Sequence, residues 1–227
     1  GYLSSTGKCF DIGTTTVSAL RRYLRAADPY AGAAFADMAG NGSLMRLAPV
    51  PLFFFRDART ALNRAADSSR TTHGAMAAID ACRYYAGLIV GALRGARKED
   101  LLAPCYTPVP GYWEARPLCA QVEAIARGSF LAKGEADIDA RGYVVSTLEA
   151  ALWAFAHTDS FEEGALRAVN LAQDADSTGA VYGQLAGAFY GEEGIPPRWR
   201  GMLARADLIT SFADGLYGAA EAQPWAS

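Results

Sequence analysis

The sequence contains few of the residues that most metal and redox sites use: two histidines and four cysteines among 227 residues. The cysteines form no Cys-x-x-Cys pair, which argues against a structural zinc site. At this length and cysteine density, a disulfide framework is not expected either. The pattern is typical of reduced thiols, so we expect a cytoplasmic protein.

A basic stripe and long hydrophobic runs are missing as well. The net charge is −3, whereas nucleic-acid-binding domains usually carry a basic patch. No apolar run approaches the ~20 residues that span a bilayer, and no basic segment of a secretory signal opens the chain. We therefore expect neither nucleic acid nor a membrane as a partner.

Strand signals are scarce, and the hydrophobic pattern is helical. Val144, Leu148, Leu152 and Phe155 recur every three to four residues, which favours a helix with one buried face. No shift in composition and no repeat divides the chain, so the sequence predicts one compact all-α domain, a multi-helix bundle over 1–227. Helices are predicted over 14–27, 74–93, 118–133, 144–155 and 202–217, with one short strand candidate at 142–147 and breaks at 28–29, 67–69, 103–111, 134–139 and 192–197.

Two carboxylates and a hydroxyl lie within four residues, at Asp174, Asp176 and Ser177, between two helical patterns. Carboxylates this close repel each other unless a proton or a cation lies between them. Hard oxygen donors suit Mg²⁺, Mn²⁺ or Ca²⁺ rather than zinc. The alternative is a helix N-cap, in which Asp or Ser accepts hydrogen bonds from the first free N–H groups. The spacing alone leaves both open and favours the cap.

The residues that follow this segment carry a wider pattern. Residues 174–199, with Ala-Gly-Ala-Phe-Tyr-Gly and a final Ile-Pro-Pro-Arg-Trp, resemble the C-terminal signature of the ADP-ribosylglycohydrolase family. The match covers essentially the whole chain and is closest to the bacterial branch, which includes the hydrolase that removes ADP-ribose from dinitrogen reductase. Four further segments match in order and spacing: Cys9-Phe10-Asp11-Ile12-Gly13, Gly40-Asn41-Gly42-Ser43-Leu44-Met45-Arg46, Arg70-Thr71-Thr72-His73 and Gly142-Tyr143-Val144.

The resemblance implies a compact all-α hydrolase that cleaves the N-glycosidic bond between ADP-ribose and an arginine side chain by a dinuclear metal mechanism. Two ions, Mg²⁺ or Mn²⁺, are implied, with Asp174, Asp176 and Ser177 as ligands. Asp11 and Asp176 are the implied catalytic residues. The expected partner is an ADP-ribosylated protein or ADP-ribose itself. The implied substrate-binding residues are Gly13, Thr14, Asn41, Gly42, Ser43, His73, Gly142 and Tyr143.

The sequence departs from the family pattern at two positions near the proposed ligands. Ser177 stands where the family usually has Thr, and it keeps the ligating hydroxyl. Ala172 stands where the family often has Gly. We expect the second change to alter the loop slightly.

Ordinary structural explanations remain open for several of these residues. Asp11 is also compatible with a solvated turn, and Gly-Asn-Gly at 40–42 with a common tight turn. His73 is also typical of a hydrogen-bonded residue at a helix start. Tyr143 equally fits a half-buried position in the core.

The family's second metal-binding element, an N-terminal Thr-Asp-Asp triplet, has no counterpart in 1–227. We therefore expect a domain that is truncated at its N-terminus and holds half of the metal-binding set. Three hypotheses follow. The chain is a hydrolase completed by a separate N-terminal segment or partner chain, a non-catalytic ADP-ribose-binding module, or a protein-interaction module.

Overall fold

The computed structural model describes residues 3–4 and 6–225. Within these residues, every element of secondary structure longer than an isolated bridge is a helix. The predicted all-α fold is confirmed. The longer helices are α1 (Thr14–Ala26), α4 (Ala58–Arg70), α5 (Met76–Leu93), α9 (Val144–Ala156), α10 (Phe161–Asn170), α11 (Ala175–Tyr190) and α13 (Ala206–Glu221). The shorter ones are η1 (Ala36–Met38), α2 (Gly42–Met45), α3 (Pro49–Phe53), α6 (Lys98–Leu101), α7 (Tyr112–Ala115), α8 (Ala120–Ala126), η2 (Glu135–Asp137), η3 (Glu192–Gly194) and α12 (Pro197–Arg200).

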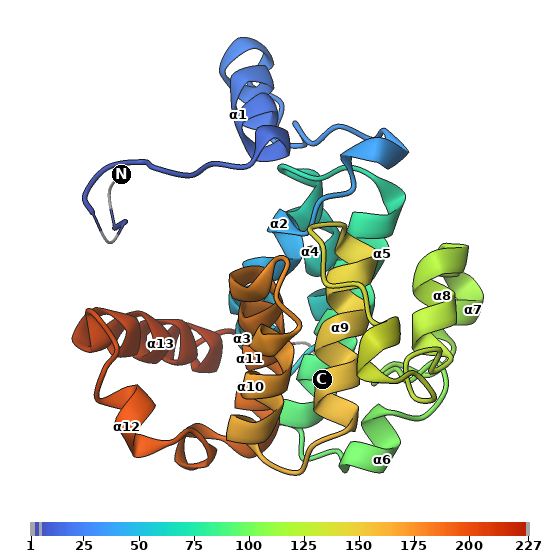
Figure 1. Cartoon of the computed structure of the whole chain (residues 1–227). Coiled ribbons are helices and arrows are strands. Elements are labelled where there is room, and N and C mark those ends of the chain that lie inside the picture. The colour runs from blue at the N-terminus through green and yellow to red at the C-terminus, as the bar shows by residue number, and fades with distance from the viewer. Residues whose placement is uncertain (1–2, 5, 226–227) are drawn as a thin grey trace.

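Helix α5 forms the centre of the bundle. All of its residues from Ala77 to Ala92 are buried, and α4, α9 and α11 pack around it (Figure 1). A helix with apolar residues all around its axis needs such surroundings. By length and hydropathy alone α5 also qualifies as a membrane span, but most of it is buried inside the fold. Its position in the core accounts for its composition.

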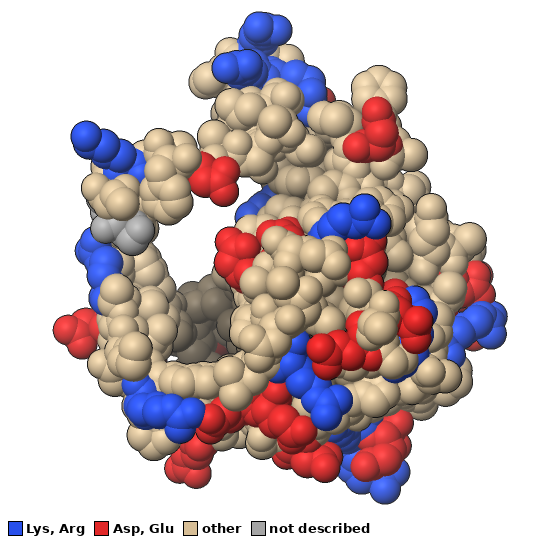
Figure 2. All heavy atoms as spheres, in the orientation of Figure 1, with Lys and Arg blue, Asp and Glu red and all other residues tan. Residues whose placement is uncertain are grey.

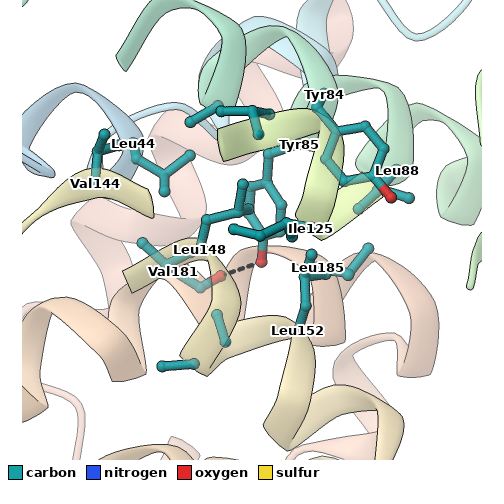
Figure 3. Close-up of a cluster of buried hydrophobic side chains, with 14 of the residues drawn as sticks. Leu44, Tyr84, Tyr85, Leu88, Ile125, Val144, Leu148, Leu152, Val181 and Leu185 are labelled. Atoms are coloured by element: carbon teal, nitrogen blue, oxygen red, sulfur yellow. Dashed lines mark hydrogen bonds between the residues drawn. The ribbon is translucent and has the colours of Figure 1, made fainter. Parts of the chain in front are cut away.

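The main core lies where α5 meets α9 and α11 (Figure 3). Leu148 and Leu152 from α9 meet Val181 and Leu185 from α11 there, all at most 1% exposed. The Tyr85 hydroxyl donates to the Val181 carbonyl oxygen at 2.5 Å, so the polar end of this buried ring is satisfied. This packing fixes the position of α11, whose first turn carries the acidic segment.

Two short backbone contacts join distant loops above this core. Gly40 pairs with Tyr143 in an isolated antiparallel bridge, and Ala33 pairs with His73 in a parallel one. Gly32 and Gly74 touch at the second contact, where a Cβ on Gly32 would lie 2.6 Å from the Gly74 nitrogen. Only glycine permits this approach of two backbones.

The first and last long helices of the described chain, α1 and α13, bury little of their surface. Helix α1 buries only Ala19 and α13 only Ala220. Both helices expose apolar side chains, including Leu24 at 82% and Phe212 at 64%. Figure 1 shows α1 and α13 extending from the bundle, and Figure 2 shows a hollow between the N-terminal segment and the helices.

The predicted helices differ from the structure mainly at their ends. Helices over 14–27, 74–93 and 144–155 are confirmed as α1, α5 and α9. The helix predicted over 118–133 is wrong at 118–119 and beyond Ala126, because α8 spans only Ala120–Ala126 and Gly128, with a φ of +90°, follows it closely. The strand candidate at 142–147 is also wrong, since Val144–Thr147 is the first turn of α9. The break predicted at 67–69 lies inside α4, and the helix predicted over 202–217 begins later, as α13.

Candidate functional site

The acidic segment forms the start of α11, after two residues with an unusual backbone. Ala172 and Gln173 have φ values of 59° and 57°, in the left-handed region that costs an ordinary residue about 1–2 kcal/mol. This conformation explains why a glycine suits position 172. The turn ends at Asp174, whose N–H donates to the Ala140 carbonyl oxygen at 3.2 Å.

Asp174 occupies the N-cap position of α11, but its side chain makes no capping hydrogen bond. The predicted N-cap is therefore confirmed for the position of Asp174, but its carboxylate does not accept the capping hydrogen bond that was expected. Asp174 Oδ2 instead accepts a hydrogen bond from Asn41 Nδ2 at 2.7 Å. The same nitrogen donates to Thr147 Oγ1 at 2.9 Å. Asn41 is only 8% exposed, so the amide holds Asp174 from a buried position.

Asp176 and Ser177 follow within the first turn of α11. Asp176 is exposed and forms no hydrogen bond or ion pair with another described residue. Ser177 is 5% exposed, and its hydroxyl donates to Met45 Sδ at 3.3 Å. Gln184, two turns further along α11, donates from Nε2 to the Leu44 carbonyl oxygen at 2.9 Å. These contacts join α11 to the Gly-Asn-Gly segment.

His73 packs beneath the Gly-Asn-Gly turn. The ring is 2% exposed, and Nδ1 lies 2.8 Å from Thr72 Oγ1. A Cβ on Gly42 would lie 2.9 Å from His73 Cε1, so glycine is needed there. Burial, aided by the nearby Arg46 charge, lowers the pKa of His73 from 6.5 to about 4. The imidazole is therefore neutral near pH 7.

Arg46 connects α2 to the end of α4. Its Nη2 donates to the Ser68 carbonyl oxygen at 2.9 Å and to the hydroxyls of Thr71 and Thr72 at 3.0 and 2.9 Å. Burial lowers the pKa of this guanidinium from its ordinary value. The contacts fix the segment that ends at His73.

These segments surround one cleft of about 440 Å³. Three regions far apart in the sequence meet there: the loop and first turn before and within α1, the Gly-Asn-Gly turn, and the start of α11. The cleft is lined by Asp11, Gly13, Thr14, Thr15, Thr16, Gly40, Asn41, Gly42, Met45, His73, Gly142, Asp174, Asp176 and Ser177.

The first turn of α1 gives one wall of the cleft free N–H groups. Gly13 caps the helix without a side-chain hydrogen bond, and the first N–H groups of any helix lack partners within it. Thr14, Thr15 and Thr16 carry these groups at the cleft. Such a helix end binds phosphate and other anions readily.

Two of the predicted substrate-binding residues do not line this cleft. Ser43 is fully buried and accepts a hydrogen bond from the Ser69 hydroxyl at 2.9 Å, so its side chain serves the packing of α2 against α4. Tyr143 is 39% exposed but lies outside the residues that line the cleft. The Tyr143 backbone pairs with Gly40, and the neighbouring Gly142, which was also predicted, lines the cleft.

Several residues of this arrangement were not among the predicted site residues. Thr15, Thr16, Gly40 and Met45 line the cleft beside predicted residues, and the first helical turn after Gly13 was the available signal for the threonines. Thr147 holds Asn41 from a position 106 residues away. No local pattern in the sequence indicates that contact.

The residues at the cleft include the type of ligand that a hard divalent cation prefers, but fewer of them than such a cation needs. Asp174, Asp176 and Ser177 offer oxygen donors of the type that Mg²⁺ and Mn²⁺ prefer. Within residues 3–4 and 6–225, however, no three His, Cys, Asp or Glu side chains form a group that could hold a metal ion. The helix N-terminus itself stabilises nearby carboxylates. The described residues therefore offer hard oxygen donors at the cleft without a group of three acidic, histidine or cysteine side chains.

Comparison with known proteins agrees with this geometry. The model of the ADP-ribosylglycohydrolase family matches residues 2–225. The chain belongs to the ADP-ribosylglycohydrolase family. The family resemblance drawn from the motifs is thereby confirmed.

Curated members of the ADP-ribosylglycohydrolase family include similar bacterial proteins. The ADP-ribosylarginine hydrolase Tri1 of Pseudomonas putida (strain GB-1) is 39% identical over 217 residues, which are 96% of this chain and 56% of that protein. Tri1 of Serratia proteamaculans (strain 568) is 34% identical over 96% of this chain and 57% of its own length. The ADP-ribosyl-[dinitrogen reductase] glycohydrolase of Rhodospirillum rubrum is 31% identical over 87% and 60%.

A solved structure has the same fold. A chain of an ADP-ribosylglycohydrolase-related protein complex superposes with a TM-score of 0.81 and 43% identity, over 92% of this chain and 69% of that one. The present chain spans somewhat more than half the length of the curated Tri1 proteins.

Proposed function

We propose that this chain binds the ADP-ribose part of ADP-ribosylarginine on a modified protein and contributes to hydrolysis of its N-glycosidic bond. The observation that carries the proposal is the shared cleft, which brings the start of α1, the Gly-Asn-Gly turn and the acidic start of α11 together. The family and the activity in the names of the Tri1 relatives support the same substrate class.

The chemistry of the lining residues divides into two parts. The N–H groups at the start of α1 suit the diphosphate of ADP-ribose. The carboxylates of Asp174 and Asp176, with Asp11 across the cleft, suit the ribose hydroxyls and proton transfer at the bond that breaks. Neutral His73 supports the turn between them. Asn41 keeps the Asp174 carboxylate turned towards the cleft.

Mg²⁺ or Mn²⁺ remains part of the proposal. Asp174, Asp176 and Ser177 would hold it, together with further oxygen ligands such as water or substrate hydroxyls. When bound, such an ion polarises a coordinated oxygen and stabilises negative charge that develops there. The catalytic roles of Asp11 and Asp176, like the cytoplasmic location and the absence of nucleic-acid and membrane partners, stay predictions.

Calorimetry with ADP-ribose, with and without Mg²⁺, together with an assay of ADP-ribosylarginine hydrolysis, tests the proposal. We expect ADP-ribose to bind. We expect Asp176→Asn to weaken the Mg²⁺-dependent part of ADP-ribose binding at least about tenfold, because a charged metal ligand is lost. Asp207→Asn is the matched control. Asp207 is also an exposed aspartate in the first turn of a helix, α13, and lies outside the cleft.

The outcomes separate the hypotheses that the sequence left open. Binding with turnover supports the hydrolase, and binding without turnover supports a non-catalytic ADP-ribose-binding module. Absence of both, with a stable complex to another protein, supports an interaction module and contradicts the proposal.

A further inference from the structure

A second cavity, of about 640 Å³, lies between α4, α5 and residues 116–117. It shares no lining residue with the cleft. We call it the arginine basin, because four arginines line it. Its lining residues are Thr60, Asn63, Arg64, Ala66, Asp67, Arg70, Met76, Ile79, Arg83, Arg116 and Pro117.

The guanidinium groups of the arginine basin outnumber the carboxylates that face them. Arg64 and Arg70 share one partner, Asp67, at 3.2 and 3.0 Å. Arg116 donates to the neutral Asn63 side chain at 2.7 Å. Arg83 is paired with buried Asp80 at 2.6 Å. The basin therefore keeps an excess of positive charge on a chain whose net charge is −3.

Two of the four arginines are held in place from behind. Arg83 is 8% exposed, donates to the Arg116 carbonyl oxygen at 2.8 Å, and lies over the Tyr112 ring at 5.4 Å from its centre. Asn63 Oδ1, which holds Arg116, also accepts from the Tyr112 hydroxyl at 2.9 Å. A binding site whose side chains are already ordered loses less entropy on binding.

The shape and chemistry of the arginine basin suit a small anion better than a protein surface. Its volume falls in the range of roughly 300–1,000 Å³ that is typical of small-molecule sites. Guanidinium groups bind phosphate oxygens through paired hydrogen bonds. Met76 and Ile79 add an apolar wall beside the charges, where the uncharged part of a ligand can pack.

We propose that the arginine basin is a second ligand site, which binds a nucleotide-sized molecule carrying a phosphate or diphosphate group. The proposal is independent of the function assigned to the cleft. It assigns Arg64 and Arg116 to direct contact with the phosphate. Arg83 acts as the buried support.

Methionine-methyl NMR of the 227-residue chain can observe the two cavities separately. The sequence has four methionines: Met76 lines the arginine basin, Met45 lines the cleft, and Met38 and Met202 line neither. We expect ADP and inorganic pyrophosphate to shift the Met76 signal saturably, with Met202 unchanged. Any shift of Met45 reports the cleft, so failure of one site is distinguishable from failure of the other.

The variants test the contact directly. Arg64→Gln with Arg116→Gln should weaken the Met76 response at least about tenfold, because two charged donors are lost. The Arg116 backbone carbonyl that accepts from Arg83 is unchanged by this substitution. Arg205→Gln, at an exposed arginine outside both cavities, is the control.

Three results would overturn the proposal. The first is a Met76 signal that neither probe moves. The second is an equal response in the double variant and the unchanged chain. The third is a hexaglutamate peptide that moves Met76 at lower concentration than pyrophosphate, which would identify the basin as a surface for acidic protein segments.

Discussion

At the scale of single residues, Asn41 uses both of its amide hydrogens on protein atoms. They go to Thr147 Oγ1 and Asp174 Oδ2, so in this structure the amide orients a carboxylate. A buried amide that satisfies a carboxylate contributes on the order of 1–3 kcal/mol when the alternative is an unpaired group. Asn41 is therefore a positioning residue for Asp174.

We expect Asn41→Ala to lower the free energy of unfolding by about 1–3 kcal/mol, because Thr147 and Asp174 both lose their partner. Urea unfolding measures this change. Thr147→Ser, which keeps the accepting hydroxyl, is the control, whereas Thr147→Val removes it. An Asn41→Ala chain as stable as the original would contradict the positioning role.

His73 predicts how stability depends on pH. Its pKa is about 4 in the folded chain against an ordinary 6.5, so the unfolded chain binds the proton more readily between these values. Stability from this group is full above about pH 6.5 and is lost as the pH falls towards 4. Between pH 7 and pH 5 the loss is on the order of 2 kcal/mol.

Urea unfolding of the original chain and of His73→Gln at both pH values isolates this contribution, because carboxylates affect both chains alike. We expect the variant to be less stable at pH 7 but to lose less on acidification. Identical losses in the two chains would show that the His73 proton does not carry the effect.

Ala172 offers a substitution that should stabilise the protein. Its φ of 59° is unfavourable for a side chain but not for glycine. We expect Ala172→Gly to raise the free energy of unfolding by up to about 1 kcal/mol, as measured by thermal or urea unfolding. A clear loss of stability would mean that the Ala172 methyl group makes a favourable contact that outweighs the strain.

At the scale of elements, glycine has opposite consequences in a loop contact and in a helix. A Cβ on Gly32 would lie within 2.7 Å of backbone atoms of Arg70, His73 and Gly74. A Cβ on Gly183, inside α11, would meet no atom within 4 Å. The first glycine is therefore required by sterics, and the second only lowers helix propensity.

We expect Gly32→Ala to lower the free energy of unfolding by about 2 kcal/mol or more, since the backbones must separate. Gly183→Ala, the matched control, should raise it by about 0.5–1 kcal/mol. Parallel urea titrations of the two variants make the comparison. Changes of the same sign would contradict the role of the Gly32 contact.

The elements also show how far the sequence could be interpreted. The recurrence of apolar residues about every 3.6 positions was sufficient to predict α1, α5 and α9, because each has a regular apolar pattern. It failed for the end of α8, where a single glycine at φ +90° decides the boundary. The break at 67–69, which was predicted from its polar residues, is wrong because contacts such as Ser69 to Ser43 hold these residues in the last turn of α4.

The same division applies to the candidate site. Family motifs located most of the residues that line the cleft, including Asp174 and Asp176. They could not show that the Ser43 side chain points into the packing between α2 and α4, or that Thr147 holds Asn41. Those facts depend on contacts between distant segments, which spacing along the chain does not encode.

At the scale of the whole molecule, burial is uneven. Nearly all of α5 is buried, whereas α1 and α13 each bury one alanine. Segments with few buried apolar contacts open at low free energy while the core remains folded. We therefore expect α1 and α13 to be less stable than the central bundle.

Amide hydrogen exchange followed by mass spectrometry measures this difference. We expect peptides from α1 and α13 to exchange through local opening, and peptides from α5 and α9 to exchange only with global unfolding. Added denaturant should accelerate exchange in α5 far more than in α13. Equal protection across all four helices would show that the molecule unfolds as one unit.

The contact between Gly32 and Gly74 has a consequence for how this scaffold can diversify. Main-chain atoms alone set the position of this contact: the Gly32 N–H donates to the Arg70 carbonyl oxygen, and the Gly74 N–H to that of Ala33. Exchanging neighbouring side chains leaves this backbone in place, and with it His73, which lines the cleft. New specificity is then expected to arise at Asp11, Gly13 and Thr14, which line the same cleft and are exposed.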